Sequence, residues 1–575
     1  MKMSFKPKNL NQSLANFNPK NKDFSKANTL KIIALGGVGD VTKNMYVYEY
    51  GNDIIIVDCG VGFPDEAMLG IDLVIPNIAY LRDKKQKIRA ILITHGHDDH
   101  IGGLPYIWPE LNVPIYSQKL TCGLIRAKFA EHKLPKDKIK TVNLSDNLKL
   151  GVFEASFYQV SHSVPDSTGI VLKTPVGTLI HQADFKMDWT PVNSQVTDVG
   201  RVARVGEQGV LMMAIDCLRV EKPGYTLSEK TIESSFAKVE AETLGKVLIT
   251  MTSSNLTRVQ QAINVALKSG RKLALAGRSM ENNFQVARDL GYLDVPANLI
   301  VPQEEVKRFP DKKIMIIIAG SQGQPGSALS RVANRDHKFI LLKKDDSVIF
   351  SADPIPSTES AQHALIDTLT RLGANVYYTA MMSDLHVSGH AAAEEIKLMI
   401  NLAKPKYLLP IGGTPRHMRV FSKMAQDLGY MENQILMAED GDVILATPGS
   451  ITISGQVDVD NVYVDGLGVG DVGSIVLRDR QVMSAEGVVV VMVPVHIHGG
   501  GLAGDPDIMS RGFVFEKKAE DLINDAKEIV KSVLTEHQGL LDWRYMRHNI
   551  EEALEKFFYE ELKRNPLILT LVVEV

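Results

Sequence analysis

Residues 94 to 103 read Thr94-His95-Gly96-His97-Asp98-Asp99-His100-Ile101-Gly102-Gly103, directly after an apolar run typical of a buried strand. His95 and His97 lie two positions apart and can face the same way from an extended segment, whereas Asp99 and His100 are displaced to a second point. One metal ion can take the first pair and a neighbouring ion the second. Many histidine-rich stretches are only solvated loops, but this spacing at the end of a strand favours a metal site.

Such a site needs more ligands than this loop provides, and two side chains at other β-rich runs can supply them. His162 and Asp184 each follow or end such a run, and Asp184 can bridge two ions. Two ions about 3.5 to 4 Å apart suit the cleavage of a phosphodiester. Asp58 ends another apolar run and is interpreted as a carboxylate that orients a ligand or loop. Each residue alone fits a capping aspartate or a hydrogen-bonded histidine equally well, and their order favours the joint interpretation.

Other short motifs follow along the chain: Gly36-Gly37-Val38-Gly39-Asp40, Lys43-Asn44-Met45, Lys222-Pro223-Gly224-Tyr225-Thr226, Gly277-Arg278-Ser279-Met280-Glu281-Asn282-Asn283, Gly320-Ser321-Gln322-Gly323, His386-Val387-Ser388-Gly389-His390, Val464-Asp465-Gly466-Leu467-Gly468 and Ser510-Arg511-Gly512-Phe513-Val514. The order of the metal-type residues resembles the metallo-β-lactamase superfamily. With these motifs, the resemblance narrows to bacterial ribonuclease J, a family of β-CASP nucleases, and covers nearly everything after residue 28.

The resemblance implies two Zn²⁺ ions per chain, with Mn²⁺ or Mg²⁺ as alternatives. It assigns His95, His97 and His162 to the first ion. It assigns Asp99 and His100 to the second ion and makes Asp184 the aspartate that bridges both. It also pairs Asp216 with His390 as a general acid for the leaving oxygen, so that the expected catalytic residues are Asp99, Asp184, Asp216 and His390. A carboxylate beside an imidazole favours the protonated ring, which supports this pairing on physical grounds.

The expected substrate is single-stranded RNA, preferably with a 5′ monophosphate. The resemblance assigns RNA contacts to Arg278, Ser321, His386, Ser388, Gly389 and His390. Glycine-rich turns offer backbone N–H donors to phosphates. Further candidate donors beside the motifs are Lys43, Lys186, Arg258, Arg331 and Arg416, although each fits a solvated surface charge equally well.

The sequence departs from the family pattern at three places. Small polar residues usually follow the β-CASP aspartate, but Cys217-Leu218-Arg219 follows Asp216 here. Gly412 stands where the family carries a metal-binding histidine, so we expect a firmly held first metal and a weaker second one. His417 is a weak candidate substitute. Thr257 replaces a histidine common in the family, which puts an RNA contact there in doubt.

Three functions compete. The first is a zinc-dependent ribonuclease in RNA decay and processing, acting as a 5′-to-3′ exonuclease with endonuclease activity as a further expectation. The second is a catalytically weakened paralogue that serves as a scaffold or partner subunit of an active ribonuclease, as Gly412 suggests. The third is a small-molecule metallohydrolase, which would not explain the His390 motif.

The expected fold class is α/β, with an αββα metallo-β-lactamase core, an inserted β-CASP α/β domain and a small C-terminal α/β domain. Alternating short β-branched runs and helical stretches, such as 119–132, are consistent with this class. The expected segments are a flexible tail (1–27), the core in two parts (28–213 and 380–449), the β-CASP domain (214–379), a linker (450–480) and the C-terminal domain (481–575).

Composition indicates an enzyme of several domains. The 575 residues are 45% hydrophobic and 23% charged, with a formal net charge of -4. A chain without a basic excess must bind RNA through a local groove. Its three scattered cysteines argue against a disulfide framework. No membrane span or signal peptide is expected, so the expected location is the cytoplasm. The C-terminal domain is expected to support a homodimer or homotetramer.

Overall fold

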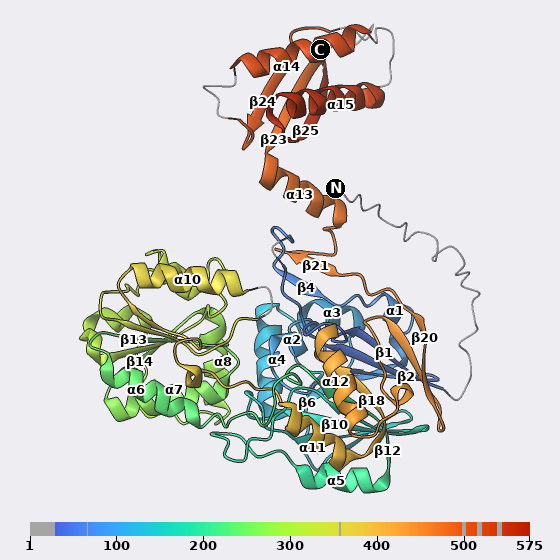
Figure 1. Cartoon of the computed structure of the whole chain (residues 1–575), viewed down its shortest axis with the longest axis vertical. Coiled ribbons are helices and arrows are strands. Elements are labelled where there is room, and N and C mark those ends of the chain that lie inside the picture. The colour runs from blue at the N-terminus through green and yellow to red at the C-terminus, as the bar shows by residue number, and fades with distance from the viewer. Residues whose placement is uncertain (1–28, 66, 356–357, 497–501, 515–519, 537–542) are drawn as a thin grey trace, which may run out of the picture.

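The computed structural model of the chain describes residues 29–65, 67–355, 358–496, 502–514, 520–536 and 543–575. The tail expected over residues 1–27 lies outside these ranges. Figure 1 shows three bodies: a two-sheet core, an inserted unit beside it and a C-terminal module set apart from both. Among the described residues, no helix combines the length and the apolar character needed to cross a membrane.

The core consists of two packed sheets with helices on their outer faces, which is the αββα class expected from the sequence. The first sheet has the order β20-β19-β1-β2-β3-β5-β6-β7, and the second β18-β12-β11-β10-β9-β8. The strands of the first sheet are β1 (Leu30–Gly36), β2 (Met45–Tyr50), β3 (Asp53–Val57), β5 (Ile88–Leu92), β6 (Ile115–Ser117), β7 (Ile139–Thr141), β19 (Asp442–Ala446) and β20 (Ile451–Gln456). Those of the second are β8 (Asn147–Leu150), β9 (Phe153–Gln159), β10 (Thr168–Thr174), β11 (Gly177–Gln182), β12 (Val210–Asp216) and β18 (Pro405–Ile411).

Alternating side chains of both sheets form one buried core between them. Ile32 and Ile55 of the first sheet belong to the same apolar cluster as Phe157 and Met213 of the second. Opposite faces of a strand alternate, so the remaining residues of the first sheet face a helical layer. The helices of the core are α1 (Ala79–Arg82), α2 (Asp98–Ile101), α3 (Leu104–Leu111), α4 (Lys119–Glu131), α5 (Val199–Gln208), α11 (Ala393–Ala403) and α12 (Pro415–Asp427).

The inserted unit lies within the segment between β12 and β18, before α11, and these two strands are parallel neighbours in the second sheet. It contains a five-stranded parallel sheet of order β14-β15-β13-β16-β17. Its strands are β13 (Val247–Thr250), β14 (Lys272–Ala276), β15 (Ile314–Ile318), β16 (Ser347–Phe350) and β17 (Asn375–Tyr377), and its helices are α6 (Thr231–Glu242), α7 (Leu256–Ser269), α8 (Arg278–Asp289), α9 (Ala328–Ala333) and α10 (Glu359–Arg371). Helix α8 packs on α4 of the core, where a Cβ at Gly123 would lie 2.6 Å from Leu290. The two bodies therefore share one apolar cluster.

The C-terminal module comprises residues 488–575 and has the sheet order β24-β23-β25. Its elements are β23 (Val488–Val495), β24 (Asp507–Arg511), α14 (Glu520–Glu536), α15 (Trp543–Leu562) and β25 (Leu567–Glu574). Helix α13 (Ser474–Glu486) precedes it and runs through the boundary expected at residues 480 and 481.

The segment expected as a linker, 450–480, is largely built into the core. Strand β20 closes one edge of the first sheet, and β21 (Val462–Asp465) pairs with both β22 (Gly468–Val469) and β4 (Leu73–Ile75).

Candidate metal centre

The loop between β5 and α2 presents the histidine-rich motif at the carboxyl end of its strand. His95 Nε2 lies 3.2 Å from His97 Nδ1, so both nitrogens face one point. His100 lies on α2, and its Nε2 is 3.5 Å from Asp99 Oδ2. Backbone packing holds the loop tightly, since a Cβ at Gly60 would lie 1.6 Å from the carbonyl oxygen of Asp99.

His162 and Asp184 join this loop from the ends of β9 and β11 and complete a four-ligand cluster. His162 Nε2 lies 3.1 Å from His97 Nδ1, and Asp184 Oδ2 lies 3.5 Å from His95 Nε2 and 3.6 Å from His162 Nε2. A tetrahedron with bonds of 2.0 to 2.1 Å has edges of about 3.4 Å. The four atoms therefore fit a tetrahedral metal ion.

A second cluster shares Asp184 with the first. Its Oδ1 lies 3.5 Å from His100 Nε2, and Asp99 is the third member. The two oxygens of Asp184 thus face different clusters, which is the arrangement that a bridging carboxylate needs. The second cluster has three protein ligands where the first has four.

Each of the four histidines has an acceptor for its other ring nitrogen. His162 Nδ1 donates to the carbonyl of Gly389 (2.8 Å), and His100 Nδ1 donates to Asp58 Oδ2 (2.7 Å). His97 Nε2 lies 2.9 Å from Ser163 Oγ, and His95 Nδ1 lies 3.0 Å from Thr94 Oγ1, two hydroxyls that can accept a hydrogen bond. Contacts of this kind fix the tautomer and orient the other ring nitrogen toward the metal position.

Asp58 is buried and contacts two residues of this network, His100 and Thr94. Besides His100, it accepts hydrogen bonds from the backbone N–H and the hydroxyl of Thr94 (both 2.8 Å). Asp58 adopts a left-handed backbone conformation (φ 60°) at the end of β3. Residues with a short polar side chain tolerate this region better than most.

Electrostatics also favours neutral metal-binding rings in the first cluster. Burial and the neighbouring His95 lower the pKa of His97 to about 3. Burial likewise holds the pKa of His162 well below its ordinary value. Histidines bind metals in the neutral form, so these rings are ready to act as ligands at neutral pH.

Asp216 and His390 lie beside the clusters, as a pair. His390 Nδ1 donates to Asp216 Oδ2 (2.8 Å), and its Nε2 lies 3.7 Å from Asp184 Oδ2. Burial lowers the pKa of His390, but Asp184 and Asp216 outweigh it and raise the pKa to about 9. The other oxygen of Asp216 accepts from the backbone N–H of Leu218 (2.9 Å). The carboxylate therefore keeps a hydrogen-bonded setting although small polar residues are missing after it.

Gly412 lies directly beside this pair, at the end of β18. A Cβ built there would be 3.5 Å from Asp216 Oδ1, in ordinary contact. His417 does not replace the missing side chain. Its Nδ1 accepts from Thr414 at the start of α12, and its Nε2 faces Glu221 at 3.7 Å.

The residues expected to contact RNA fall into two places. Arg278 and Ser321 line a cleft of about 930 Å³ between the core and the inserted unit, together with Arg331. Ser388 and Gly389 lie on the loop that carries His390, where a Cβ at Gly389 would come within 2.5 Å of the His162 ring.

Two expected phosphate donors are instead buried. Lys186 and Arg258 are each about 1% exposed and pair with carboxylates inside the protein. Thr257, where the family pattern raised a doubt, is also buried. The sequence shows only that these cationic residues lie next to motifs, and this does not reveal that they are buried.

Sequence reasoning assigned no role to Thr94, Ser163 or the Gly389 carbonyl as partners of the histidines. The signal for the first two was adjacency to a ligand, since each hydroxyl directly neighbours His95 or His162 in the chain. A backbone carbonyl gives no such signal. Asn44, from the Lys43-Asn44-Met45 motif, also reaches this site: its amide nitrogen lies 3.3 Å from His100 Nε2.

Comparisons with known proteins agree with this geometry. Residues 38–188 match the metallo-beta-lactamase superfamily, and residues 380–437 match the Zn-dependent metallo-hydrolase RNA specificity domain. A solved structure described as a protein of unknown function from Enterococcus faecalis V583 has a TM-score of 0.53 and 15% identity, covering 72% of this chain and 100% of that chain. At this identity it supports the fold alone. The fold and the histidine–aspartate clusters thus define a metal-binding hydrolase of the metallo-β-lactamase class.

The remaining matches are more specific. Residues 244–369 match the ribonuclease J β-CASP domain, and residues 475–575 match the ribonuclease J C-terminal domain. Ribonuclease J2 of Bacillus subtilis (strain 168) is 39% identical over 549 residues, covering 95% of this chain and 99% of that protein. Ribonuclease J 1 of Streptococcus pyogenes is 38% identical over 95% of this chain and 98% of that protein. Ribonuclease J 2 of Staphylococcus aureus (strain MRSA252) is 34% identical over 97% and 99%. The chain belongs to the ribonuclease J family, a class of metal-dependent ribonucleases.

Proposed function

We propose that this family member is a zinc-dependent ribonuclease that cleaves RNA from a 5′ monophosphate end and also internally, in RNA decay and processing. The observation that carries the proposal is the four-ligand cluster of His95, His97, His162 and Asp184, in which four of the six ligand-to-ligand distances are 3.1 to 3.6 Å, close to the edge of a tetrahedral site. Nitrogen and carboxylate ligands in this geometry favour Zn²⁺, with Mn²⁺ or Mg²⁺ as alternatives.

The two clusters would hold one ion each, and such a pair would supply a hydroxide nucleophile at neutral pH and stabilise the charge on the reacting oxygens. The residues of the chain prepare this chemistry. Asp184 offers one oxygen to each cluster, and Asp58 orients His100. His390, held by Asp216, presents Nε2 toward Asp184, and from this atom a proton would pass to the leaving oxygen. General acid catalysis of this kind contributes roughly 10²- to 10⁴-fold to the rate.

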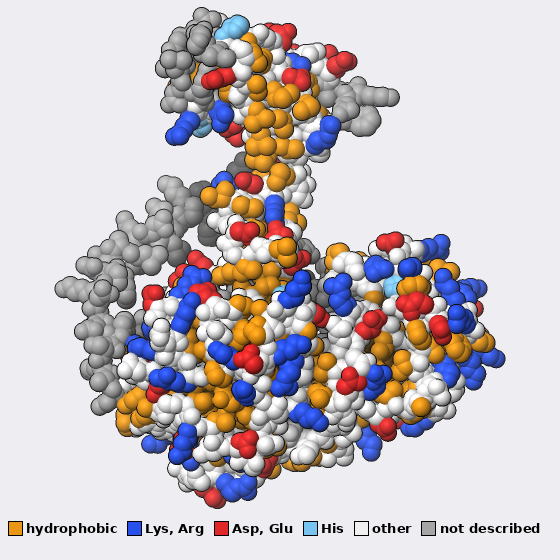
Figure 2. All heavy atoms as spheres, turned by 180° about the vertical axis from the view of Figure 1, so that it is seen from behind, with side chains coloured by type: hydrophobic (Ala, Val, Ile, Leu, Met, Phe, Trp, Pro, Cys, Tyr) orange, Lys and Arg blue, Asp and Glu red, His pale blue; other side chains and the backbone are white. Residues whose placement is uncertain are grey.

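Single-stranded RNA with a 5′ monophosphate is the proposed substrate, since the cleft lined by Arg278 and Ser321 is roomy and carries cations. A homodimer or homotetramer in the cytoplasm is the proposed state. Figure 2 shows apolar side chains gathered on the C-terminal module, where Met509, Leu569, Leu571 and Val573 are each 45 to 48% exposed. Exposed apolar patches of this kind commonly mark association surfaces.

A weakened paralogue that acts as a partner of an active ribonuclease is the second candidate. Gly412 favours it, because this position beside Asp216 has no side chain to serve as a ligand for the second ion. Removing a residue that hydrogen-bonds to a metal ligand typically lowers metal affinity roughly 10- to 100-fold. Loss of a ligand itself should lower the affinity of the second cluster by at least as much. The first cluster keeps all of its members.

Purified protein and 5′-labelled single-stranded RNA separate the candidates. We expect mononucleotide release from the wild-type protein and its loss in the Asp99→Ala and His100→Ala variants. Inactivity of the wild-type protein would support the partner role instead. Hydrolysis of small esters without RNA cleavage would reject both candidates in favour of a small-molecule hydrolase.

A further inference from the structure

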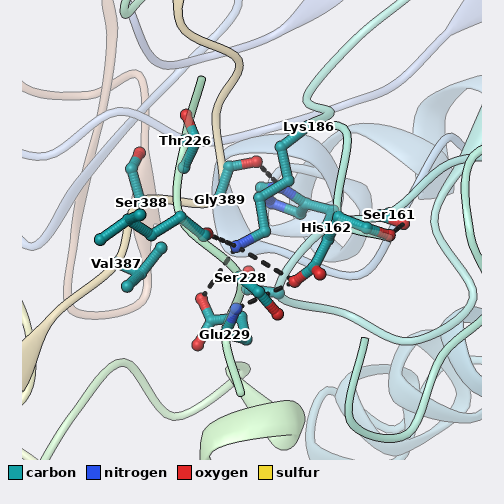
Figure 3. Close-up of polar contacts among 12 residues, drawn as sticks. Ser161, His162, Lys186, Thr226, Ser228, Glu229, Val387, Ser388 and Gly389 are labelled. Carbon is teal, nitrogen blue, oxygen red and sulfur yellow. Dashed lines mark hydrogen bonds and ion pairs between the residues drawn. The ribbon is translucent and has the colours of Figure 1, made fainter. Parts of the chain in front are cut away.

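Four fully buried charges lie where the inserted unit meets the metal centre. Lys186, two residues after Asp184, directs its Nζ to within 3.6 Å of Glu229 Oε1 and 3.7 Å of Asp188 Oδ2 (Figure 3). Glu229 also binds Arg258, a residue of α7. The two positive charges, of Lys186 and Arg258, are thus neutralised by the two negative charges of Asp188 and Glu229. Buried charges persist only where they are paired and hydrogen-bonded, so this group holds its geometry firmly.

Arg258 uses its guanidinium to connect three separate segments. Nη2 donates to Glu229 Oε1 (2.9 Å) and to the carbonyl of Val387 (2.9 Å). Nη1 donates to the carbonyl of Ser351 (2.6 Å), directly after β16, and to His386 Nδ1 (2.8 Å). The planar fork of arginine can satisfy several acceptors at fixed angles, which a lysine cannot do.

The contact with His386 defines where that ring carries its proton. A guanidinium only donates hydrogen bonds, so Nδ1 of His386 must accept and cannot carry a proton. The proton of the neutral ring therefore sits on Nε2. The side chain of His386 is 19% exposed, and Asp353 Oδ2 lies 3.7 Å from Nε2, too far for a direct hydrogen bond.

The segment after His386 reaches the metal centre within four residues. The carbonyl of Gly389 accepts from His162 Nδ1, as Figure 3 shows, and the next residue, His390, pairs with Asp216. The hydrogen bond from Arg258 to Val387 fixes this segment at its beginning. Tight packing of Gly389 against the His162 ring leaves it little freedom to shift.

We propose that Arg258 is a positioning residue for RNA cleavage: it holds His386 as a neutral ring with its N–H on Nε2, presented as a donor to an RNA phosphate oxygen, and anchors the segment 386–390. The proposal rests on the proposed ribonuclease function. It gives Arg258 a role through other residues, in place of the direct phosphate contact expected from the sequence.

Nitrogen-15 NMR of histidine-labelled protein tests the proposal, with His386→Phe to assign the signal among 15 histidines. In the wild-type protein, His386 should show a protonated Nε2 and an unprotonated Nδ1. Adding single-stranded RNA to the Asp99→Ala protein should shift the Nε2 signal. A ring protonated on Nδ1, or a signal that RNA leaves unmoved, would overturn the proposal. Both readouts need no cleavage, so they stay informative even if the wild-type protein proves inactive and the proposed function fails.

Arg258→Lys tests the positioning itself, with Arg271→Lys as a matched control. Arg271 is equally buried and binds Glu240 and backbone carbonyls, but it lies away from the segment 386–390. We expect Arg258→Lys to alter the His386 signal and to lower kcat/KM roughly 10- to 100-fold, as small misplacements of reacting groups do. Arg271→Lys should do neither. In a His386→Phe background the effect of Arg258→Lys should shrink, and equal losses in both backgrounds would contradict action through His386.

Discussion

At the scale of single residues, Asp216 and His390 combine a short contact with strong electrostatic coupling. Burial alone would keep the imidazole neutral, yet two carboxylates raise the pKa of His390 to about 9. The ring can then donate from both nitrogens at once. Asp216 itself is 2% exposed, so its partner is the protein and not solvent.

Replacing Asp216 by asparagine keeps the shape of the side chain and removes its charge. The amide oxygen of asparagine can still accept from Nδ1, but His390 loses the negative charge that stabilises its protonated form. We expect kcat on 5′-labelled RNA to fall roughly 10²-fold or more. Retained zinc should stay the same, because the four-ligand cluster does not include Asp216. An unchanged rate with intact metal content would show that this pair takes no part in proton transfer.

Replacing Gly412 by histidine would add a possible ligand at the position where the family pattern has one. After dialysis we expect the wild-type protein to retain one firmly bound metal per chain, and Gly412→His to retain closer to two. Gly412 has a φ of 66°, so any side chain there strains the backbone. Gly412→Ala controls for this strain and should not raise the metal content. Two tightly held equivalents in the wild-type protein would refute the expected weakness of the second cluster.

The six residues predicted as ligands lie together in two clusters, and the signals that pointed to them, strand ends and the H-x-H spacing, are local. Asp58 and His95 follow parallel strands of the first sheet, and Asp184 follows β11 of the second, so each stands after an apolar run at the end of a strand. Burial of Lys186 and Arg258 was not predictable, because it depends on Glu229 arriving from a distant segment. A single sequence shows that a cation lies near a motif but not whether a carboxylate already neutralises it.

At the scale of elements, helix α4 begins at a buried carboxylate. Asp166 accepts hydrogen bonds from the backbone N–H groups of Leu120 (2.7 Å) and Thr121 (3.3 Å). Burial outweighs these contacts and raises the pKa of Asp166 to about 6. An aspartate in an unfolded chain titrates near pH 3.9. The folded state therefore binds the proton more tightly than the unfolded state does.

This shift predicts a pH dependence of stability. The contribution of Asp166 should be fully present below about pH 4 and should be lost as the pH rises through about 6. Asp166→Asn does not titrate, so the free energy of unfolding of the wild-type protein minus that of the variant should fall between pH 4 and 6. Denaturant unfolding of both proteins across this range measures the difference. A difference that stays constant or rises would contradict the raised pKa.

Local sequence patterns predict some elements of this fold correctly and miss others. The helix expected over residues 119–132 is α4, because its apolar spacing is regular. The glycine-rich stretch from residue 450 predicts a linker, yet β20 forms a hairpin with β19 and β21 pairs with β4, almost 400 residues earlier in the chain. Pairing partners far apart in the chain leave no trace in local composition.

At the scale of the whole molecule, the C-terminal module stands apart from the core in Figure 1 and carries an exposed apolar sheet face. We expect Leu571→Lys to dissociate the proposed oligomer, because each buried leucine contributes about 1.5 to 3 kcal/mol and symmetry counts it twice. Light scattering with size-exclusion chromatography measures the mass. Leu467→Lys alters an exposed leucine outside this module and should leave the mass unchanged. A monomeric wild-type protein would remove the basis of this prediction.

Metal removal and return test the central claim most directly, since everything from the two-sheet core to the loop at His390 converges on Asp184. Cleavage of 5′-phosphorylated RNA is measured on protein treated with a chelator, and again after zinc is restored. We predict that cleavage disappears with the metal, returns with zinc in the wild-type protein, and does not return in Asp184→Asn. Cleavage that survives complete metal removal would contradict the account.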